Sequence, residues 1–193
     1  MKQVLLSLLL LGCLKGFSQQ NTSPIFEETY VDSTKIKIDS ILLIGAGSLT
    51  TNIFIDDVSE YAIKSLSEKK IVARYYFLGE TIKDAKSALD TIKKEGYKAI
   101  LFFIPKGDTY FEPQGHINAT DVNTRLGSFK IITPSSSLDY HQRFLFQLCL
   151  PDANKTNIWS ASVEVSCNLK KSKTAKKVAT NTISYFKNNG YIN

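Results

Sequence analysis

The sequence predicts a single domain of the α/β (α+β) class, built on a mixed β-sheet. The composition, with 43% hydrophobic and 22% charged residues over 193 positions, is typical of a globular chain and excludes a disordered one. Apolar runs alternate with helix-period segments between residues 40 and 104, which predicts a β-α-β-α-β half with right-handed crossovers. Beyond residue 126 several strand patterns precede a C-terminal helix, which predicts antiparallel strands.

Residues 1–18 have the organisation of a secretory signal peptide. Lys2 provides a positive start, residues 4–11 are largely apolar, and Gly16-Phe17-Ser18 matches the small-x-small cleavage pattern. The apolar stretch is too short to span about 30 Å of hydrocarbon as a stable anchor. Later apolar runs are interrupted by charge, Gly or Pro, so we expect no transmembrane segment in the mature chain.

Lipidation at Cys13 is the alternative at this end of the chain. Leu10-Leu11-Gly12-Cys13 resembles a lipobox, but the apolar region before it would be short, and Lys15 suits the polar end of a conventional signal. We favour cleavage after Ser18 and expect an exported protein, periplasmic or associated with the outer membrane. Cleavage would remove Lys2 and Lys15 and no acidic residue, so the formal charge would fall from +6 to +4.

Residues 19–39 are expected to form a tether with a candidate edge strand at residues 35–38, and residues 40–193 to form the domain. The apolar run at residues 41–46 predicts a strand covered on both faces. A helix follows, with an apolar stripe made of Ile55, Val58, Ala62 and Leu66. β-Branched and aromatic residues predict a second strand at residues 71–78.

A second helix is predicted between Thr81 and Gly96 and a third strand at residues 99–104. The stripe of that helix consists of Ala85, Leu89 and Ile92. Residues 105–124 contain several Pro and Gly residues, so we expect them to form the longest loop. Three antiparallel strands are expected at residues 126–133, 143–150 and 158–169, and a third helix at residues 172–188 with Ala175, Val178, Ile183 and Phe186 facing inward.

Two cysteines, Cys149 and Cys167, remain after cleavage of the signal, and export would permit a disulfide between them. Matching the apolar faces of the last two strands places these cysteines on opposite sides of the sheet. Diverging side chains cannot be bridged. We therefore expect two free and mostly buried thiols.

Gly45-Ala46-Gly47 lies between a predicted strand and a predicted helix, where a dinucleotide-binding fingerprint would be found. Thr50 stands where that fingerprint requires Gly or Ala, and no acidic residue ends the next strand at the required distance. We interpret the glycines as a tight strand-to-helix turn. Ser48 lacks the Gly-x-Ser-x-Gly context of a nucleophile elbow, and we expect no cofactor.

The residues at 105–124 offer one alternative, hydrolytic site. His116 accompanies acidic residues there, and the set is Asp108, Glu112, His116 and Asp121. Their irregular spacing fixes no geometry and lacks the alternation of a calcium loop, so a solvated polar loop explains them equally well. With only 2 His and 3 Cys in the chain, metal or thiol chemistry is disfavoured, and we expect no metal site.

Five lysines gather at the predicted start of the closing helix, namely Lys170, Lys171, Lys173, Lys176 and Lys177. Positive charge at a helix N-terminus opposes the helix dipole, so the cluster is a candidate surface for an anionic partner in the envelope, such as lipid headgroups, acidic glycans or the acidic surface of an envelope protein. A solvated helix face is the alternative. No aromatic residues interleave with the lysines, so we expect no nucleic-acid binding.

Short motifs in the last third of the chain carry a family resemblance. These are Leu148-Cys149-Leu150-Pro151-Asp152, Ile158-Trp159-Ser160-Ala161 and the ending Asn189-Gly190-Tyr191-Ile192. With them the chain resembles a class of uncharacterised exported bacterial envelope proteins and lipoproteins, whose compact α/β domain is similar to the N-terminal domain of TolB. The resemblance implies an envelope location and no catalytic residues. In physical terms Trp159 is expected to be a core anchor.

These observations predict a non-enzymatic exported protein with an accessory or binding role in the periplasm or at the outer membrane. The lysine cluster and residues 105–124 are its expected contact surfaces. A small hydrolase that uses His116 and its acidic neighbours is the alternative, and it requires a pocket joining that segment to residues 45–48. A purely structural subunit is a third interpretation.

Overall fold

The computed structural model describes residues 23–32, 36–79, 96–124, 127–151, 156–169 and 173–193, with the backbone alone described between residues 114 and 138. Its elements in chain order are β1 (Ile25–Val31), β2 (Ser40–Gly45), α2 (Leu49–Glu68), β3 (Val72–Phe77), β4 (Ala99–Thr124), β5 (Gly127–Cys149), β6 (Asn157–Cys167) and α4 (Lys173–Asn188). The helix expected between Thr81 and Gly96 lies outside the described residues except for Gly96 itself. The expected signal peptide and Cys13 also lie outside them.

One six-stranded sheet organises the molecule, with the strand order β1-β6-β5-β4-β2-β3. The β2–β3 and β2–β4 pairs are parallel, whereas β4–β5, β5–β6 and β1–β6 are antiparallel. The fold class predicted from sequence is therefore confirmed: a parallel α/β half is followed by antiparallel strands and a C-terminal helix.

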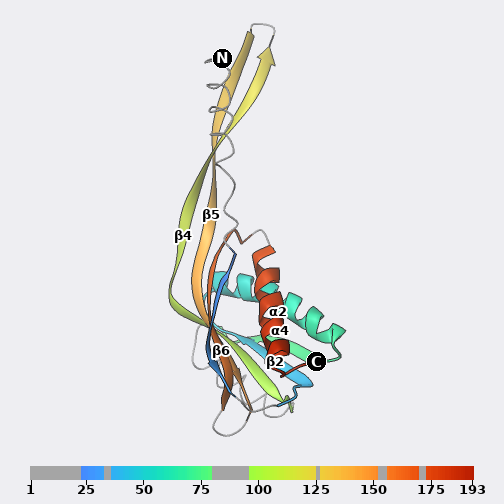
Figure 1. Cartoon of the computed structure of the whole chain (residues 1–193). Helices are drawn as coiled ribbons and strands as arrows, with labels where there is room; N and C mark the ends of the chain where they lie inside the picture. The colour runs from blue at the N-terminus through green and yellow to red at the C-terminus, as the bar shows by residue number, and fades with distance from the viewer. Residues whose placement is uncertain (1–22, 33–35, 80–95, 125–126, 152–155, 170–172) are drawn as a thin grey trace, which may run out of the picture.

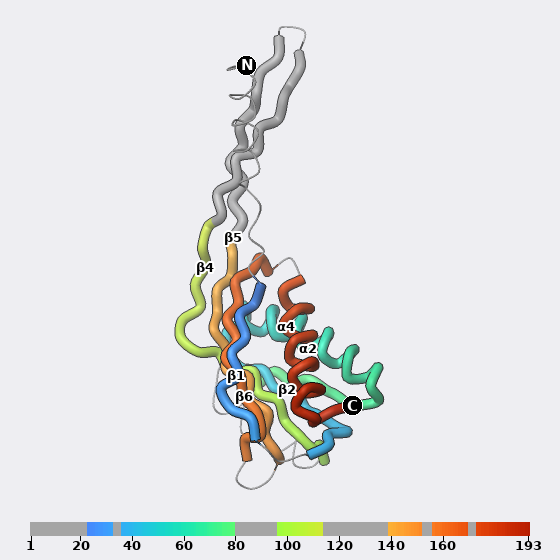
Figure 2. Tube along the Cα trace, viewed as in Figure 1, coloured from blue at the N-terminus to red at the C-terminus, as the bar shows by residue number. Residues whose placement is uncertain are grey.

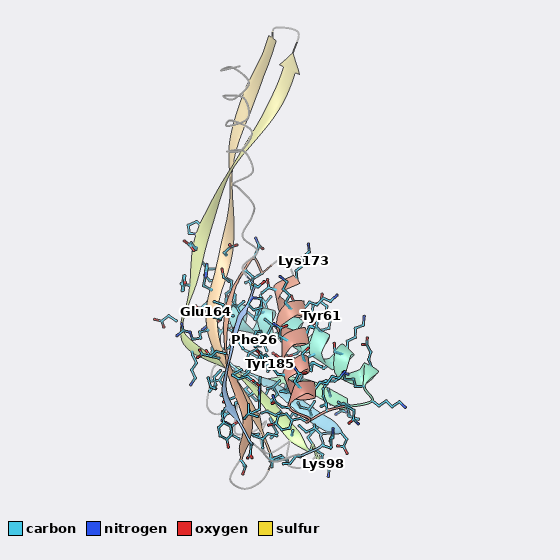
Figure 3. All side chains as sticks on the ribbon, in the orientation of Figure 1. Phe26, Tyr61, Lys98, Glu164, Lys173 and Tyr185 are labelled. Atoms are coloured by element: carbon cyan, nitrogen blue, oxygen red, sulfur yellow. The ribbon has the colours of Figure 1, made fainter. Side chains whose placement is uncertain are left out.

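The helices α2 and α4 lie against one face of the sheet (Figure 1). Each buries the stripe expected from its sequence, with Ile55, Val58, Ala62 and Leu66 on α2 and Ala175, Val178, Ile183 and Phe186 on α4. Aromatic rings join the layers: Phe26 of β1 lies 5.9 Å from Tyr185 of α4, measured between ring centroids (Figure 3). This layer contains the larger hydrophobic core.

A smaller core lies around β2 and consists of Leu42, Ile44, Leu78, Tyr97 and Ile100. Because successive side chains of a strand point to opposite faces, Leu42 and Ile44 belong to this cluster while Ile41 and Leu43 belong to the larger one. The strand β2 is thus buried on both faces, as its continuous apolar run predicted.

The edge strand lies earlier in the chain than expected. It is formed by Ile25–Val31, which pairs antiparallel with β6, whereas Ile36–Ile38 is not a strand. Most of β1 is exposed, so its sequence carries little of the apolar alternation that marks a strand. The segment at Ile38 is held by the C-terminal residues instead, since its N–H donates to the carbonyl of Tyr191 at 2.8 Å.

The expectation of a long loop at residues 105–124 is wrong, because those residues continue strand β4. The strands expected at residues 126–133 and 143–150 are the two ends of one long strand, β5. Pro and Gly are tolerated here because a strand accepts them at open edges and at bulges, and Gly107 sits in a β4 bulge with a left-handed φ of 69°.

The expectation for the cysteines is confirmed, since both thiols are free and buried. The register adds a second reason: Cys149 pairs with Asn157, whereas Cys167 pairs with Tyr140 towards the other end of the β5–β6 ladder. Trp159 has no exposed surface and is a core residue, as expected.

Candidate functional site

The β4–β5 hairpin extends far beyond the rest of the sheet (Figure 1). Figure 2 shows the coloured parts of β4 and β5 side by side where the hairpin leaves the body. Strand β6 pairs with β5 only as far as Tyr140↔Cys167, and β2 pairs with β4 only as far as Gly45↔Phe103. We call residues 112–124 and 127–139 the arm; its backbone pairing runs from Glu112↔Asp139 to Thr124↔Gly127. Thirteen such pairs correspond to about 40 Å of two-stranded ribbon.

A bulge in β4 lies where the arm leaves the body. Lys106 pairs with Arg143 and Tyr110 pairs with His141, so residues 107–109 stand opposite the single residue Gln142. The Gln142 side chain is 3% exposed and fills this bulge. Its Nε2 donates to the carbonyls of Lys106 and Arg143 at 3.1 Å and of Gly107 at 3.5 Å, and its Oε1 accepts from the Thr109 hydroxyl.

A shallow depression of about 380 Å³ lies beside the bulge. Register pairs place Ile25, Glu164, Arg143 and Lys106 in one row across β1, β6, β5 and β4. Within this row the Arg143 guanidinium and the Glu164 carboxylate are 3.4 Å apart, and both side chains are more than half exposed (Figure 3 labels Glu164). Ser23, Asp108, Tyr110 and Ser166 also line the depression.

Aromatic side chains mark the base of the arm. The rings of Tyr110 and His141 are stacked with centroids 4.6 Å apart, and His141 Nε2 lies 3.4 Å from Glu112 Oε2. The ring of Phe111 packs against the buried ring of Tyr140, with centroids 6.1 Å apart. Tyr110 and Phe111 are nevertheless 59% and 44% exposed, so the base of the arm presents apolar surface to solvent.

The residues of the alternative hydrolytic site are not brought together. Asp108 lies in the bulge, Glu112 begins the arm, and the positions of His116 and Asp121 follow further along the same strand. An extended strand separates positions 108 and 121 by about 40 Å, too far for one catalytic cluster. The side chains of His116 and Asp121 lie outside the described residues.

The histidine that contacts Glu112 is His141 and not His116. This contact depends on strand register, so residue spacing along the chain does not reveal it. The depression includes Asp108 but not the residues at 45–48 that the hydrolase hypothesis requires. Among the described side chains there is no group of three or more His, Cys, Asp or Glu placed to hold a metal ion.

The lysine cluster is described in part. Lys173, Lys176 and Lys177 are exposed at the start of α4, and Lys170 and Lys171 lie outside the described residues. The Lys177 Nζ donates to Ser23 Oγ at 3.3 Å, so the start of α4 adjoins the point where the described chain begins. Figure 3 shows Lys173 on the side of the body from which the arm projects.

The glycines at 45–47 have structural roles. A Cβ on Gly45 would lie 2.7 Å from the Tyr75 hydroxyl, and Gly47 adopts a φ of 126° beside Pro105 and Thr51. Ser48 then caps α2, with its hydroxyl accepting from the Thr51 N–H at 3.3 Å. These contacts account for the tight strand-to-helix turn.

No family model matches this chain, and no curated protein matches it. Among solved structures, a PelC dodecamer from Paraburkholderia phytofirmans is similar with a TM-score of 0.46 and 11% identity, over 88% of this chain and 99% of that chain. A PDZ domain protein from Parabacteroides distasonis gives a TM-score of 0.36 and 10% identity, over 89% of this chain and 37% of that one. Both scores are low, so nothing is transferred from these neighbours.

In the described part of the chain, neither helix has the length and apolar character needed to cross a bilayer.

Proposed function

We propose that this protein is a non-enzymatic exported envelope protein with an accessory or binding role, and that it contacts its partner through the arm. The proposal places it in the periplasm or at the outer membrane, in keeping with its N-terminal sequence and its resemblance to envelope proteins and lipoproteins. The observation that carries the binding role is a ribbon of thirteen residue pairs that no third strand joins in the described structure.

A lone two-stranded ribbon is marginally stable in water. No other described strand pairs with either edge of this ribbon, and backbone N–H and C=O groups along such an edge can pair with a strand of another chain. An arm of about 40 Å that had no partner would be a liability for folding and solubility. A partner strand or surface that covers the arm removes this liability, and strand addition of this kind is a recurring mode of protein recognition.

The exposed rings of Tyr110 and Phe111 support binding at the base of the arm. Aromatic side chains are enriched among the residues that contribute most to protein interfaces. Here the two rings are held by neighbours, with Tyr110 stacked on His141 and Phe111 packed on Tyr140. Anchors that are already ordered lose little conformational entropy when a partner covers them.

The lysines at the start of α4 form a second contact surface in this proposal, directed at an anionic partner. Lys173, Lys176 and Lys177 are exposed, and the first turn of α4 contains no acidic residue. Their role is separable from that of the arm, because changes at these exposed lysines leave the hairpin sequence intact.

Site-specific photo-crosslinking in cells tests the arm as a contact surface. A benzoyl-phenylalanine residue replaces Phe111 at the base of the arm or, as the control, Val72, an exposed apolar residue on the edge strand β3. We expect a crosslinked envelope partner from position 111 only. In a shortened variant, Asn-Gly replaces residues 113–138 to close a two-residue hairpin, and the crosslink should be lost.

Identical crosslinks from positions 111 and 72, or full crosslinking of the shortened variant, would contradict the proposal. Circular dichroism and the melting temperature of the shortened variant verify that its body is folded. A variant with Lys173→Glu, Lys176→Glu and Lys177→Glu tests the second surface by the same readout. For the export step, we expect N-terminal sequencing of the mature protein to begin at Gln19, whereas a lipid-blocked Cys13 would establish the alternative.

A further inference from the structure

In the part of the chain that the structure describes, the arm is joined to the body only through β4 and β5, and the β4 bulge lies at this junction. A bulge bends the strand that contains it and increases its local twist, so the bulge determines the direction in which the arm leaves the sheet. The left-handed φ of Gly107 belongs to the same bend. A Cβ there would meet no atom within 4 Å, so glycine is required by the backbone conformation and not by lack of space.

Gln142 is a polar exception in an apolar row. Alternate residues of β5 face the helices, and the others in this row, Tyr140, Phe144, Phe146 and Leu148, all belong to the larger core. A buried amide lowers stability unless its polar atoms are hydrogen-bonded. The Gln142 amide meets this condition at the bulge, through the carbonyls of Lys106 and Gly107 and the hydroxyl of Thr109.

We infer that Gln142 is a positioning residue that locks the bulge in one conformation and so fixes the direction of the arm. The carbonyls of Lys106 and Gly107 lie where the β4–β5 register is interrupted, and the Gln142 amide supplies the donor that a regular ladder would supply. The inference rests on the proposed function in one respect. The direction of the arm matters because a partner would contact both the arm and the rings of Tyr110 and Phe111 at its base.

The structure gives the bulge room to change conformation when the lock is removed. Lys106, Gly107 and Asp108 line the depression of about 380 Å³, and Gln142, which also lines it, holds the same segment through its side-chain amide. A segment with packed protein on every side could not move, but this one borders open space, and the Gln142 amide binds two of its carbonyls. Loss of the amide should therefore redirect or loosen the arm while the body stays folded.

Distance measurements between two spin labels test this inference on the isolated protein. One label is attached at Glu68→Cys, the last residue of α2, and the other at Ser137→Cys, just beyond the junction, so that it reports the direction of the arm and not the motion of its tip. In protein prepared without residues 1–18, and so without Cys13, the native thiols should stay unlabelled, because Cys149 and Cys167 are both buried and burial raises the pKa of Cys167 to about 12. A sample without the new cysteines checks this.

In the Gln142→Leu variant we expect the distance distribution to shift or to become roughly twofold broader than that of the parent protein. The matched control is Gln147→Leu, on the same strand but facing away from the bulge, which should leave the distribution unchanged. If Gln142→Leu does not fold, Thr109→Val removes one hydrogen bond of the lock and should give a smaller change of the same kind.

A distribution identical to that of the parent in every folded variant would overturn the role of Gln142. An equal change in the Gln147→Leu control would overturn it as well. Because no partner is present, this failure is distinct from failure of the proposed function, which is read from crosslinks of the shortened arm.

Discussion

At the scale of single residues, Trp159 joins three parts of the molecule. Its ring is fully buried and packs edge-on against Phe186 of α4, with centroids 5.1 Å apart. Its Nε1 donates to Glu28 Oε1 of β1 at 2.7 Å, and the same oxygen accepts from Asn189 Nδ2 at 3.0 Å. One side chain thus holds the edge strand, its neighbour β6 and the end of the last helix together.

We predict that Trp159→Phe lowers the free energy of unfolding by about 2 kcal/mol, through loss of a charge-assisted hydrogen bond and of packed ring volume. Urea unfolding followed by circular dichroism measures this. The control is Glu28→Gln, which keeps an oxygen acceptor for the indole and should lose less than half as much stability. Equal losses in the two variants would show that the carboxylate charge, and not the indole ring, dominates this site.

The buried thiol of Cys167 should make the free energy of unfolding depend on pH. Burial, and secondarily the negative charge of Asp139, raise the pKa of this thiol from 9.0 to about 12. The folded protein therefore keeps the thiol proton over a range in which the unfolded chain has lost it. This contribution to stability is complete below pH 9 and is lost as the pH rises from 9 to about 12.

Stability should accordingly fall between about pH 8 and about pH 10.5, and Cys167→Ala should make this fall smaller. The urea midpoints of the two proteins at both pH values test the prediction. Burial also raises the pKa values of Tyr75 and Tyr140, so part of the alkaline loss should remain in the variant. An unchanged pH dependence in Cys167→Ala would exclude the thiol as a source of the effect.

At the scale of elements, the β2–α2 turn shows what a glycine contributes beyond its backbone angle. Gly47 and Gly190 both have positive φ, of 126° and 76°. A Cβ on Gly47 would lie 3.1 Å from both Pro105 and Thr51, whereas a Cβ on Gly190 would meet no atom within 4 Å. The loss at Gly190 therefore comes from backbone strain alone, whereas at Gly47 crowding adds to a φ that lies further from the left-handed region open to other residues.

We expect Gly190→Ala to lower the free energy of unfolding by about 1 kcal/mol and Gly47→Ala to lower it by about 3 kcal/mol, because strain and crowding act together at Gly47. Differential scanning calorimetry of the two variants gives the comparison. Equal losses would mean that Pro105 and Thr51 move aside without resistance, and that crowding does not explain the glycine at position 47.

Elements with a strong local pattern could be predicted from the sequence. Strand β2 is a continuous apolar run, and α2 and α4 bury the stripes that their periodicity indicated. Strand β4 was predicted only at its body end, because Pro105, Gly107 and Pro113 resemble loop residues, whereas β5 was predicted at both ends but not between them. An open strand edge tolerates these residues, and a local pattern does not reveal which edge is open.

The candidate site depends still more on pairing. The contact of His141 with Glu112, the ion pair of Arg143 with Glu164 and the position of Gln142 in the bulge all follow from strand register. A shift of one residue would reverse the face of every side chain on a strand, so these contacts could not be derived from residue spacing along the chain. The free cysteines were predicted because apolar faces alone were enough to separate them.

At the scale of the whole molecule, two regions of different stability share the same strands. In the body, β4 lies between β2 and β5, and both helices cover the larger core. Beyond Phe103 the same strand pairs with β5 alone in the described structure, and beyond the bulge it leaves the body. Local stability follows the number of packed neighbours, so the change should be sharp and should lie at the bulge, where β4 leaves the packed body.

Amide hydrogen exchange tests this division directly, because it measures local opening residue by residue. Strand β4 provides its own control: Leu101–Phe103 are paired on both sides, whereas residues 114–124 are paired on one. We expect the arm amides to exchange more than about 100-fold faster than those at 101–103 in the isolated protein, since fraying segments open at almost no free energy while core strands open only with global unfolding. Addition of the partner identified by photo-crosslinking should slow amide exchange along the arm and leave the exchange rates in the body unchanged. Protection of the arm equal to that of the body in the isolated protein would show that the ribbon is stable without a partner, and would remove the physical reason for assigning it a binding role.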